Sequence, residues 1–365
     1  MKVIFFTSTL TSGGAERVIS LLANEFNKKG HEIEVIALTS ISPDFYVVDE
    51  GVKFIHADKA CHGSLLKEMF WVRKHVREVH PDIVIAFMEA VYEFVLLALQ
   101  GTGIPVITSE RKDPSTLGPL RKILRWILLP TSTCCAHVVQ THQIKSYYNK
   151  TVQRKTHIIY NPVNERVFDE NVQNLTLHRK KRIISVGRLY PQKNQEMLIK
   201  AFSALSAKYK DWNLVIYGEG FLRSQLEKLI GELSMRDSIF LPGVSHNVIE
   251  EIAQSEIFAM SSNYEGMSNA MIEAMCVGTP VVSTRVSGTD ELIRDGENGL
   301  LVDVGDEKKM IAALDRLMGD VRLRKKFSNA YVAQRDCFKT ENIIEKWLKL
   351  CNTFIKDNSN PDKKL

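Results

Sequence analysis

Short apolar runs alternate with amphipathic stretches along almost the whole chain, and this alternation limits the fold more than any other feature. In the first half, strands are predicted at residues 2–6, 32–38, 52–56, 82–87, 104–108 and 136–140, and helices at 15–29 and 64–79. Continuous apolar strands separated by helices are typical of a parallel sheet that is covered on both faces. The first half is therefore predicted to be a doubly wound α/β unit.

The hydrophobic pattern lapses between Pro162 and Arg182, where polar and charged residues dominate. Such a lapse is typical of a crossing between domains. Beyond it the pattern restarts, with strands predicted at 182–186, 213–217, 239–241, 257–260 and 280–283, and helices at 192–207, 221–233, 247–254, 268–277, 306–318 and 341–355. The sequence thus predicts two Rossmann-like domains, residues 1–163 and 164–340, followed by a last helix. Residues 357–365 are predicted to be disordered.

The cysteines and apolar runs bear on the compartment of the protein. The six cysteines fall in no metal-ligand spacing, and a chain of 365 residues needs no disulfides, so a reducing cytosol is expected. The apolar run 3–6 is too short for the core of a signal peptide, and no run approaches the roughly 18 residues of a membrane span.

Charge is weak overall but uneven along the chain. The formal net charge of +5 is far below that of a dedicated nucleic-acid binder, so no nucleic-acid partner is expected. Residues 111–155, however, hold nine lysines and arginines against one acid, Asp113, which is a local net charge of +8. This stretch is predicted to face something anionic.

A glycine pair opens the first predicted helix, in the motif Ser-Gly-Gly-Ala-Glu at residues 12–16. Gly13 and Gly14 would let a ligand approach the backbone, and the free amides of a helix start favour phosphate. The motif is not the G-x-G-x-x-G dinucleotide fingerprint, which counts against a dehydrogenase. A tight strand-to-helix turn that simply needs glycine remains an alternative.

Two cations lie in the loop after the predicted strand 182–186. Arg188 and Lys193 follow Gly187, and an arginine fork together with a lysine point charge suits a departing diphosphate. A solvated loop is the alternative. Gly218 and Gly220 end the next strand and would allow close approach of a base or ribose.

The sharpest candidate is a segment with two glutamates, residues 263–274. Glu265 precedes Gly266 at a predicted helix start, where a carboxylate can hold sugar hydroxyls or balance a developing positive charge. Glu273 lies two turns into the helix and can take ribose hydroxyls, while the amides of residues 266–269 meet phosphate. A solvated helix glutamate is the alternative for Glu273. Glu219 and Glu227 share the same spacing, but Glu227 is predicted on a polar helix face.

These motifs, in this order and on a double α/β pattern, resemble those of the retaining glycosyltransferases of family 4, which have the GT-B fold. The resemblance covers essentially the whole chain, at residues 12–17, 186–193, 265–273, 278–282 and 297–302. It implies an interdomain cleft and a last helix that crosses back onto the first domain. It also implies that the first domain binds the acceptor and the second the nucleotide sugar.

The same resemblance implies roles for individual residues. Arg188 and Lys193 would bind the donor diphosphate, and Glu265 would contact the transferred sugar; these three are the expected catalytic residues. The expected donor-binding residues are Gly13, Gly14, Gly187, Gly218, Gly266, Met267, Ser268, Asn269 and Glu273. No metal or cofactor is implied, because the chain has no Asp-x-Asp motif and cationic side chains can replace a Mg²⁺ clamp.

One segment departs from the common family pattern. Many relatives carry a histidine after the strand equivalent to 104–108, whereas this chain has Ser-Glu-Arg-Lys-Asp-Pro at residues 109–114. The segment resembles a variety found in enzymes that build bacterial surface polysaccharides and lipid-linked oligosaccharides. Glu110 and Arg111 are expected to orient the donor or the acceptor. His137 and His142 are expected to be structural.

The expected activity is retaining transfer of a hexose or N-acetylhexosamine from a UDP-sugar to a lipid-linked oligosaccharide. Helix 64–79 and segment 117–129 mix bulky apolar with basic residues, which predicts contact with an anionic membrane surface at the inner face of the cell membrane. Apolar core packing of these helices is the alternative. Two other functions remain open, a nucleotide-sugar epimerase on the same fold and a non-catalytic nucleotide-sugar-binding subunit.

Overall fold

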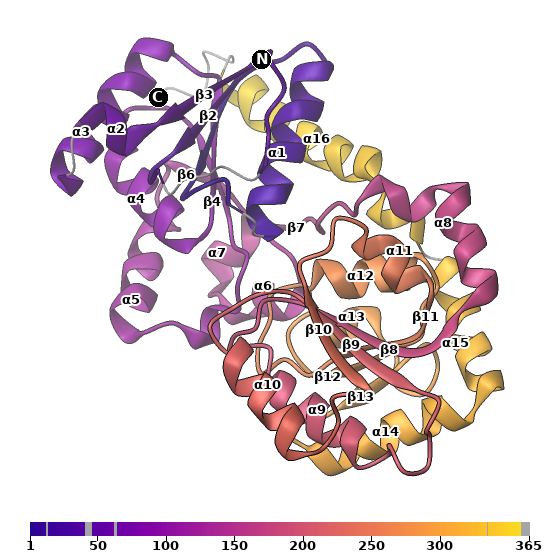
Figure 1. Ribbon diagram of the computed structural model, residues 1–365. Helices are drawn as coiled ribbons and strands as arrows, with labels where there is room; N and C mark the ends of the chain where they lie inside the picture. Colours follow the sequence, from indigo (N-terminus) through magenta and orange to yellow (C-terminus); the bar gives the residue numbers. More distant parts are fainter. Residues whose placement is uncertain (12–13, 41–45, 62–63, 334, 359–365) are drawn as a thin grey trace. The chain divides into compact units, whose positions relative to one another are not determined.

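The computed structural model describes residues 1–11, 14–40, 46–61, 64–333 and 335–358 (Figure 1). The chain forms two compact units. Unit 1 consists of Met1–Pro162 together with the end of the chain from Glu341, and unit 2 is Val163–Thr340. No helix in the described ranges has the length and apolar character needed to span a bilayer.

Within its described residues, unit 1 is built on a parallel sheet of order β3-β2-β1-β4-β5-β6-β7. The strands are β1 (Lys2–Thr7), β2 (Glu32–Ala37), β3 (Val52–His56), β4 (Ile83–Phe87), β5 (Val106–Ser109), β6 (Cys134–Val139) and β7 (Thr156–Ile158). The helices are α1 (Gly14–Lys28), α2 (Ala57–Cys61), α3 (Leu65–Val79), α4 (Glu89–Leu99), α5 (Pro119–Leu128), α6 (His142–Tyr147) and α7 (Lys150–Arg154), with a 3₁₀ turn η1 (Pro114–Thr116). The strand order reverses between β1 and β4.

Successive residues of β1 explain why this strand is apolar throughout. Val3 and Phe5 belong to the core on one face of the sheet, whereas Ile4 and Phe6 belong to the core on the other face. Side chains alternate between the faces of a strand, so a strand covered by helices on both sides needs apolar residues at every position.

The last helix, α16 (Thr340–Asn358), packs into the core of unit 1. Trp347 is fully buried there, and its ring stacks on Phe87 of β4 at a centroid distance of 5.6 Å. The predicted return of this helix to the first domain is confirmed. The predicted disorder is wrong for Asp357 and Asn358, which continue the helix past Ile355, a residue still packed on the core. Residues 359–365 lie outside the described residues.

Unit 2 contains a second parallel sheet, of order β10-β9-β8-β11-β12-β13 in the part of the chain described. Its strands are β8 (Lys180–Val186), β9 (Asn213–Tyr217), β10 (Ile239–Gly243), β11 (Ser255–Met260), β12 (Val281–Thr284) and β13 (Leu300–Val302). Its helices are α8 (Glu170–Leu175), α9 (Gln195–Ser203), α10 (Arg223–Glu232), α11 (Val248–Ala253), α12 (Asn269–Cys276), α13 (Thr289–Leu292), α14 (Glu307–Gly319) and α15 (Val321–Val332). The 3₁₀ turns η2 (Glu165–Phe168), η3 (Thr176–His178) and η4 (Arg335–Phe338) complete the unit.

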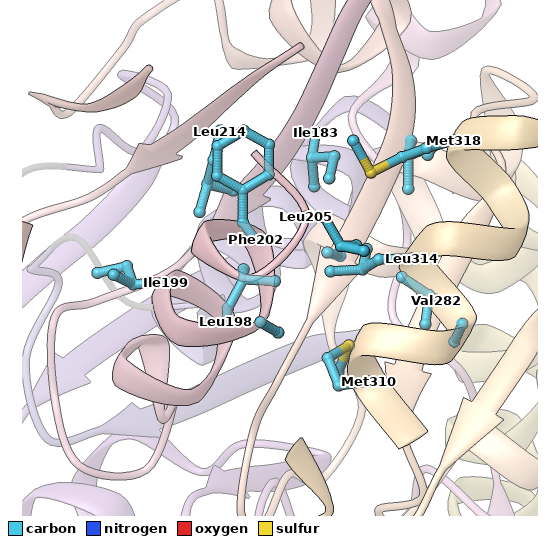
Figure 2. Close-up of a cluster of buried hydrophobic side chains, with 14 of the residues drawn as sticks. Ile183, Leu198, Ile199, Phe202, Leu205, Leu214, Val282, Met310, Leu314 and Met318 are labelled. Carbon is cyan, nitrogen blue, oxygen red and sulfur yellow. The ribbon is translucent and has the colours of Figure 1, made fainter. Parts of the chain in front are cut away.

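The core of unit 2 contains side chains of α9 and α14 together with side chains of the sheet. Figure 2 shows Phe202 of α9 with Leu214 of β9, and Leu314 of α14 in the same cluster as Ile183 of β8. The predicted fold class, two doubly wound Rossmann-like domains, is confirmed.

Several elements differ from the prediction: β7, β13, α8 and α13 were not predicted, and α9 and α15 differ as follows. Helix α9 begins at Gln195 rather than at residue 192, because Asn194 adopts a left-handed conformation with φ of 46° and ends the preceding loop. Helix α15 was not predicted. It buries Leu323, Phe327 and Tyr331 at a spacing of four residues, and the many cations around them hide this stripe in the sequence.

Candidate active site

The order of the second sheet reverses between β8 and β11. The chain continues from β8 to β9 on one side and from β11 to β12 on the other, and both strands are parallel, so their carboxyl ends lie at one edge. Open α/β sheets bind ligands at such a reversal. The loops that follow these two strands, residues 187–194 and 261–268, contain the three expected catalytic residues.

Lys193 and Glu265 are in direct contact. The Lys193 Nζ lies 2.5 Å from Glu265 Oε1, and Glu265 is only 7% exposed. The Ser262 hydroxyl donates to the same oxygen at 2.7 Å, and the Gln192 amide donates to Oε2 at 3.2 Å. Three donors therefore hold the carboxylate in one orientation. The sequence predicted both charged residues at this site but not their contact.

Hydrogen bonds to the backbone carbonyls of loop 187–194 connect it to loop 261–268. Asn263 N donates to Gln192 O at 2.7 Å, and the Asn263 side-chain amide donates to Pro191 O at 2.9 Å. The Ser261 hydroxyl donates to Lys193 O at 2.9 Å. These bonds fix the backbone on which Lys193 and Glu265 stand, so the pair is built on a rigid support.

The glycines in this region have a packing role. A Cβ on Gly218 would lie 2.1 Å from Gly187 O, and one on Gly220 would lie 2.4 Å from Leu189 O. Gly218 also has φ of +140°, which only glycine adopts readily. The sequence predicted that a ligand approaches these glycines closely. In the structure, the loop that contains Gly187 and Leu189 approaches them instead. A Cβ on Gly187 would in turn lie 2.9 Å from Lys193 Cε.

Arg188 lies in the same loop but outside the Lys193–Glu265 cluster. It is exposed, and its guanidinium lies over the ring of Tyr190 at 5.3 Å. Among the residues that the structure describes, Arg188 makes no ion pair. Its donors are thus available to an anion at this edge of the sheet.

Helix α12 begins beside Glu265. Ser268 caps the helix by accepting a hydrogen bond from Met271 N at 3.4 Å, and Gly266 and Met267 are buried just before it. Asn269, the first helical residue, is half-buried. Phosphate binding by the amides of this turn stays a prediction.

The two glutamate pairs with the same spacing have different surroundings. Glu273 is 3% exposed, so the alternative of a solvated helix glutamate is wrong. Glu227 is exposed on α10 and pairs with Arg223 at 2.9 Å, as expected for a residue on a polar face. Burial, which the spacing did not reveal, separates the two.

In unit 1, Gly14 begins α1 directly after β1, whereas Gly13 lies outside the described residues. Glu110 follows β5 and is fully buried. The Tyr92 and Tyr148 hydroxyls donate to Glu110 Oε2 at 2.7 and 2.8 Å, and an Arg125 terminal nitrogen donates to it at 2.8 Å. Glu110 thus belongs to an internal polar cluster, which the sequence did not predict.

Burial governs the titration of this cluster. It raises the pKa of Glu110 to about 8 against the opposing charge of Arg125, and the nearby Glu89 carboxyl adds to the rise. Burial also lowers the pKa of His137 to about 3, and the imidazole Nδ1 lies 2.8 Å from the Thr108 hydroxyl. A neutral buried imidazole fits the expected structural role of His137. His142 is exposed at the start of α6.

Arg111 differs from its neighbour Glu110. Its guanidinium lies over the Phe87 ring at 4.5 Å, and one terminal nitrogen donates to Asn161 Oδ1. The Nε and the other terminal nitrogen are buried and have no partner within the described residues. Burial lowers the pKa of Arg111 to about 9, so it stays cationic near neutral pH. A partly buried cation with unsatisfied donors is suited to bind an anion.

Helix α5 turns two different faces to its surroundings. Arg125 is buried and pairs with Glu93 at 2.7 Å, and Arg121 pairs with the same carboxylate at 2.9 Å. The opposite face exposes large apolar residues, namely Leu120, Ile123, Trp126 and Ile127, and α3 exposes Leu65, Leu66 and Phe70. The alternative that these side chains form core is therefore wrong, although Val72 and Val76 of α3 are buried.

Two family models match the chain. The model described as "Glycosyltransferase Family 4" matches residues 12–167, and the model described as "Glycosyl transferases group 1" matches residues 167–332. Together the two matches run from the glycine motif of unit 1 to the end of α15.

Proteins that match nearly the whole chain are also glycosyltransferases by name. An uncharacterized glycosyltransferase of Haemophilus influenzae is 31% identical and the match covers 95% of this chain and 98% of that protein. The Campylobacter jejuni GalNAc-alpha-(1->4)-GalNAc-alpha-(1->3)-diNAcBac-PP-undecaprenol alpha-1,4-N-acetyl-D-galactosaminyltransferase is 29% identical, over 96% of this chain and 98% of its own length. Anabaena HepE, solved in complex with UDP-glucose, is similar in fold, with a TM-score of 0.81 at 16% identity over 97% of this chain and 100% of that one.

Proposed function

The chain belongs to the glycosyltransferases of family 4, and on this premise we propose that it transfers a hexose or N-acetylhexosamine from a UDP-sugar to a lipid-linked saccharide, with retention of the anomeric configuration. The observation that carries the proposal is the Lys193–Glu265 pair at the strand-order reversal of unit 2. Lys193 would act on the leaving diphosphate, and Glu265 beside it would act on the reacting sugar.

The second unit would bind the donor. Arg188, Lys193 and the amides at the start of α12 accept the charge that develops on the diphosphate as it leaves. Glu265 faces the sugar and balances the positive charge of an oxocarbenium-like anomeric carbon. Glu273 takes the ribose hydroxyls.

In the reaction the bond from the anomeric carbon to the diphosphate oxygen breaks, and the acceptor oxygen forms its bond on the same face of the sugar. The acceptor hydroxyl gives its proton to an oxygen of the departing diphosphate. Cationic side chains perform the charge neutralisation that a divalent metal provides in other transferases, so no metal is needed.

The first unit would bind the acceptor. The Campylobacter relative is named for a saccharide on a PP-undecaprenol carrier, and an acceptor of this class has a diphosphate and a long hydrocarbon chain. Arg111 offers unsatisfied donors to an anion. The exposed apolar residues of α3 and α5, together with the nearby cations, would rest on an anionic membrane surface, where such a carrier is found.

The test is a transfer assay with the purified chain. Thermal-shift screening first identifies the UDP-sugar that binds, because a ligand at 100 times its Kd adds about 2.7 kcal/mol to the free energy of unfolding. That donor is then incubated with undecaprenyl-diphosphate-linked saccharides, and the anomer of the product is read by NMR. An α-linked product from an α-linked donor supports the proposal.

Two outcomes would contradict it. Conversion of the donor sugar into its epimer without any acceptor would identify an epimerase. Donor binding without transfer to any lipid-linked saccharide would identify a binding subunit.

A further inference from the structure

A groove of about 460 Å³ opens in unit 1 between α5 and the α6–α7 segment. We name it the α5 groove. Its walls are mostly apolar and aromatic, formed by Leu117, Ile123 and Trp126 on one side and by Tyr147, Tyr148 and Val152 on the other. The volume falls in the range of roughly 300–1,000 Å³ typical of small-molecule sites.

The α5 groove reaches from the exposed apolar face of α5 to the buried cluster around Glu110. Trp126 lines the groove and is 69% exposed, so one side of it is open at that apolar face. Arg125 and Tyr148 line it as well, and each donates to Glu110 at 2.8 Å.

The charges along the groove suit an anionic ligand. None of the described residues that line it is acidic. Lys122 lines the groove. It donates to Ser115 O at 2.9 Å and pairs with no carboxylate in the described part of the chain. Arg125, by contrast, pairs with the carboxylate of Glu93. A ligand with a hydrocarbon chain joined directly to a diphosphate would satisfy both the apolar walls and the cation of Lys122.

Building on the proposed function, we infer that the α5 groove binds the isoprenoid units next to the diphosphate of the lipid-linked acceptor, with Lys122 as a partner of the diphosphate. A phospholipid matches less well, since glycerol separates its chains from its phosphate. The groove then selects acceptors by their carrier and not only by their saccharide.

A matched pair of variants on α5 tests this inference. Ile123→Trp fills the groove, whereas Ile127→Trp adds the same side chain on the same exposed face, one turn further on, outside the groove. Both positions are more than half exposed, so both variants should fold, which thermal unfolding checks. The probe is farnesyl diphosphate, with its Kd measured by calorimetry.

We expect Ile123→Trp to raise the Kd for farnesyl diphosphate at least tenfold and Ile127→Trp to change it less than twofold. Inorganic diphosphate, which has no chain, should bind both variants like the wild type. Equal effects of the two variants, or no effect of either, would overturn the inference.

Photolabelling locates the chain directly. A farnesyl diphosphate that carries a diazirine should label residues 117–126 or 147–152, and undecaprenyl diphosphate should compete with it. Labelling confined to other segments, or equally strong competition by phosphatidylglycerol vesicles, would overturn the inference. Neither measurement needs turnover, so failure of the proposed transferase activity would be seen separately in the transfer assay.

Discussion

The side chains of Lys193 and Glu265 meet at 2.5 Å although 72 positions separate the two residues in the sequence. Their contact joins the loop after β8 to the loop after β11. Each side chain depends on the other for its position, so a substitution of either changes the geometry of the candidate site as well as its charge.

Replacing Glu265 by glutamine should remove the charge and keep the size of the side chain. We expect kcat to fall about 10²–10³-fold, the loss typical when one stabilising group is removed from a transition state, while the Kd of the donor changes little. Steady-state kinetics and calorimetry measure the two quantities. Glu227→Gln, on the exposed face of α10, is the control and should match the wild type. If Glu265→Gln kept half of the wild-type activity, Glu265 would have no part in the chemistry.

Lys193→Ala should weaken UDP binding and also destabilise the fold, since it leaves a buried carboxylate without its cation. Breaking a fully buried pair costs ~3–5 kcal/mol, and the partial exposure of Lys193 reduces this to about 2 kcal/mol. In the double variant with Glu265→Gln, the free energy of unfolding in urea should recover, but UDP affinity should not. Lys200→Ala, which breaks an exposed pair with Glu196, should cost only ~0.3–0.5 kcal/mol. Unchanged UDP affinity in Lys193→Ala would exclude Lys193 from donor binding.

Glu110 should make unfolding depend on pH. Its pKa is about 8 in the folded protein against 4.5 for a free glutamate, so the folded state holds a proton that the unfolded state has lost. The stability that this proton contributes is complete below pH 4.5 and is lost as the pH rises through 8. His137 has the opposite effect, because its lowered pKa makes it destabilising only below pH 6.5.

Between pH 6.5 and 8 the effect of Glu110 on stability is therefore not opposed by that of His137. There the wild type should lose about 2 kcal/mol of unfolding free energy relative to Glu110→Gln, at a slope of about 1.4 kcal/mol per pH unit. Urea titrations at several pH values measure the difference, with Glu227→Gln as the control. A constant difference across this window would show that Glu110 is ionised in the folded protein.

Helix α5 should attach the protein to anionic vesicles. At low salt, co-sedimentation with phosphatidylglycerol vesicles should exceed that with phosphatidylcholine vesicles, because cations accompany the exposed apolar face. Trp126→Glu combined with Ile127→Glu should abolish the attachment. Val321→Glu, at an exposed apolar position of unit 2, should leave it intact. Identical binding to both kinds of vesicle would rule the membrane surface out.

Removal of divalent metal should leave the transferase active, since Arg188 and Lys193 neutralise the leaving group in the proposed mechanism. Within the described residues no group of three metal-ligating side chains converges. Activity after dialysis against EDTA should stay within twofold of the untreated value. A loss that Mg²⁺ restores would contradict the mechanism.

The fold could be predicted from the sequence because strands that are apolar at every position, such as β1, are typical of any doubly wound unit. The candidate site could be predicted as two loops, since Arg188 and Glu265 each follow an apolar strand. The contact between the two loops could not be predicted. Lys193 meets Glu265 because β8 and β11 are neighbours, and the order of the strands in the sheet is not visible in the sequence of either loop. The buried pair of Arg125 and Glu93 gave no local signal either.

Helix α5 shows a second limit of the sequence. Leu120, Ile123 and Ile127 recur at the helical period, and this pattern is the same whether the stripe faces a protein core or lipid. The large exposed fractions, 82% for Leu120 and 69% for Trp126, show that these side chains are not in the core of unit 1, and they follow from the way in which Arg125 directs the other face inward.

The burial of Trp347 in unit 1 has a consequence for biosynthesis. The core that begins with β1 lacks α16 until that helix has left the ribosome, whereas unit 2 is complete in the sequence before then. Nascent unit 1 therefore exposes an apolar face during most of translation. A stop codon shortly before Trp347 would harm the amino-terminal half of the enzyme, the part synthesised first.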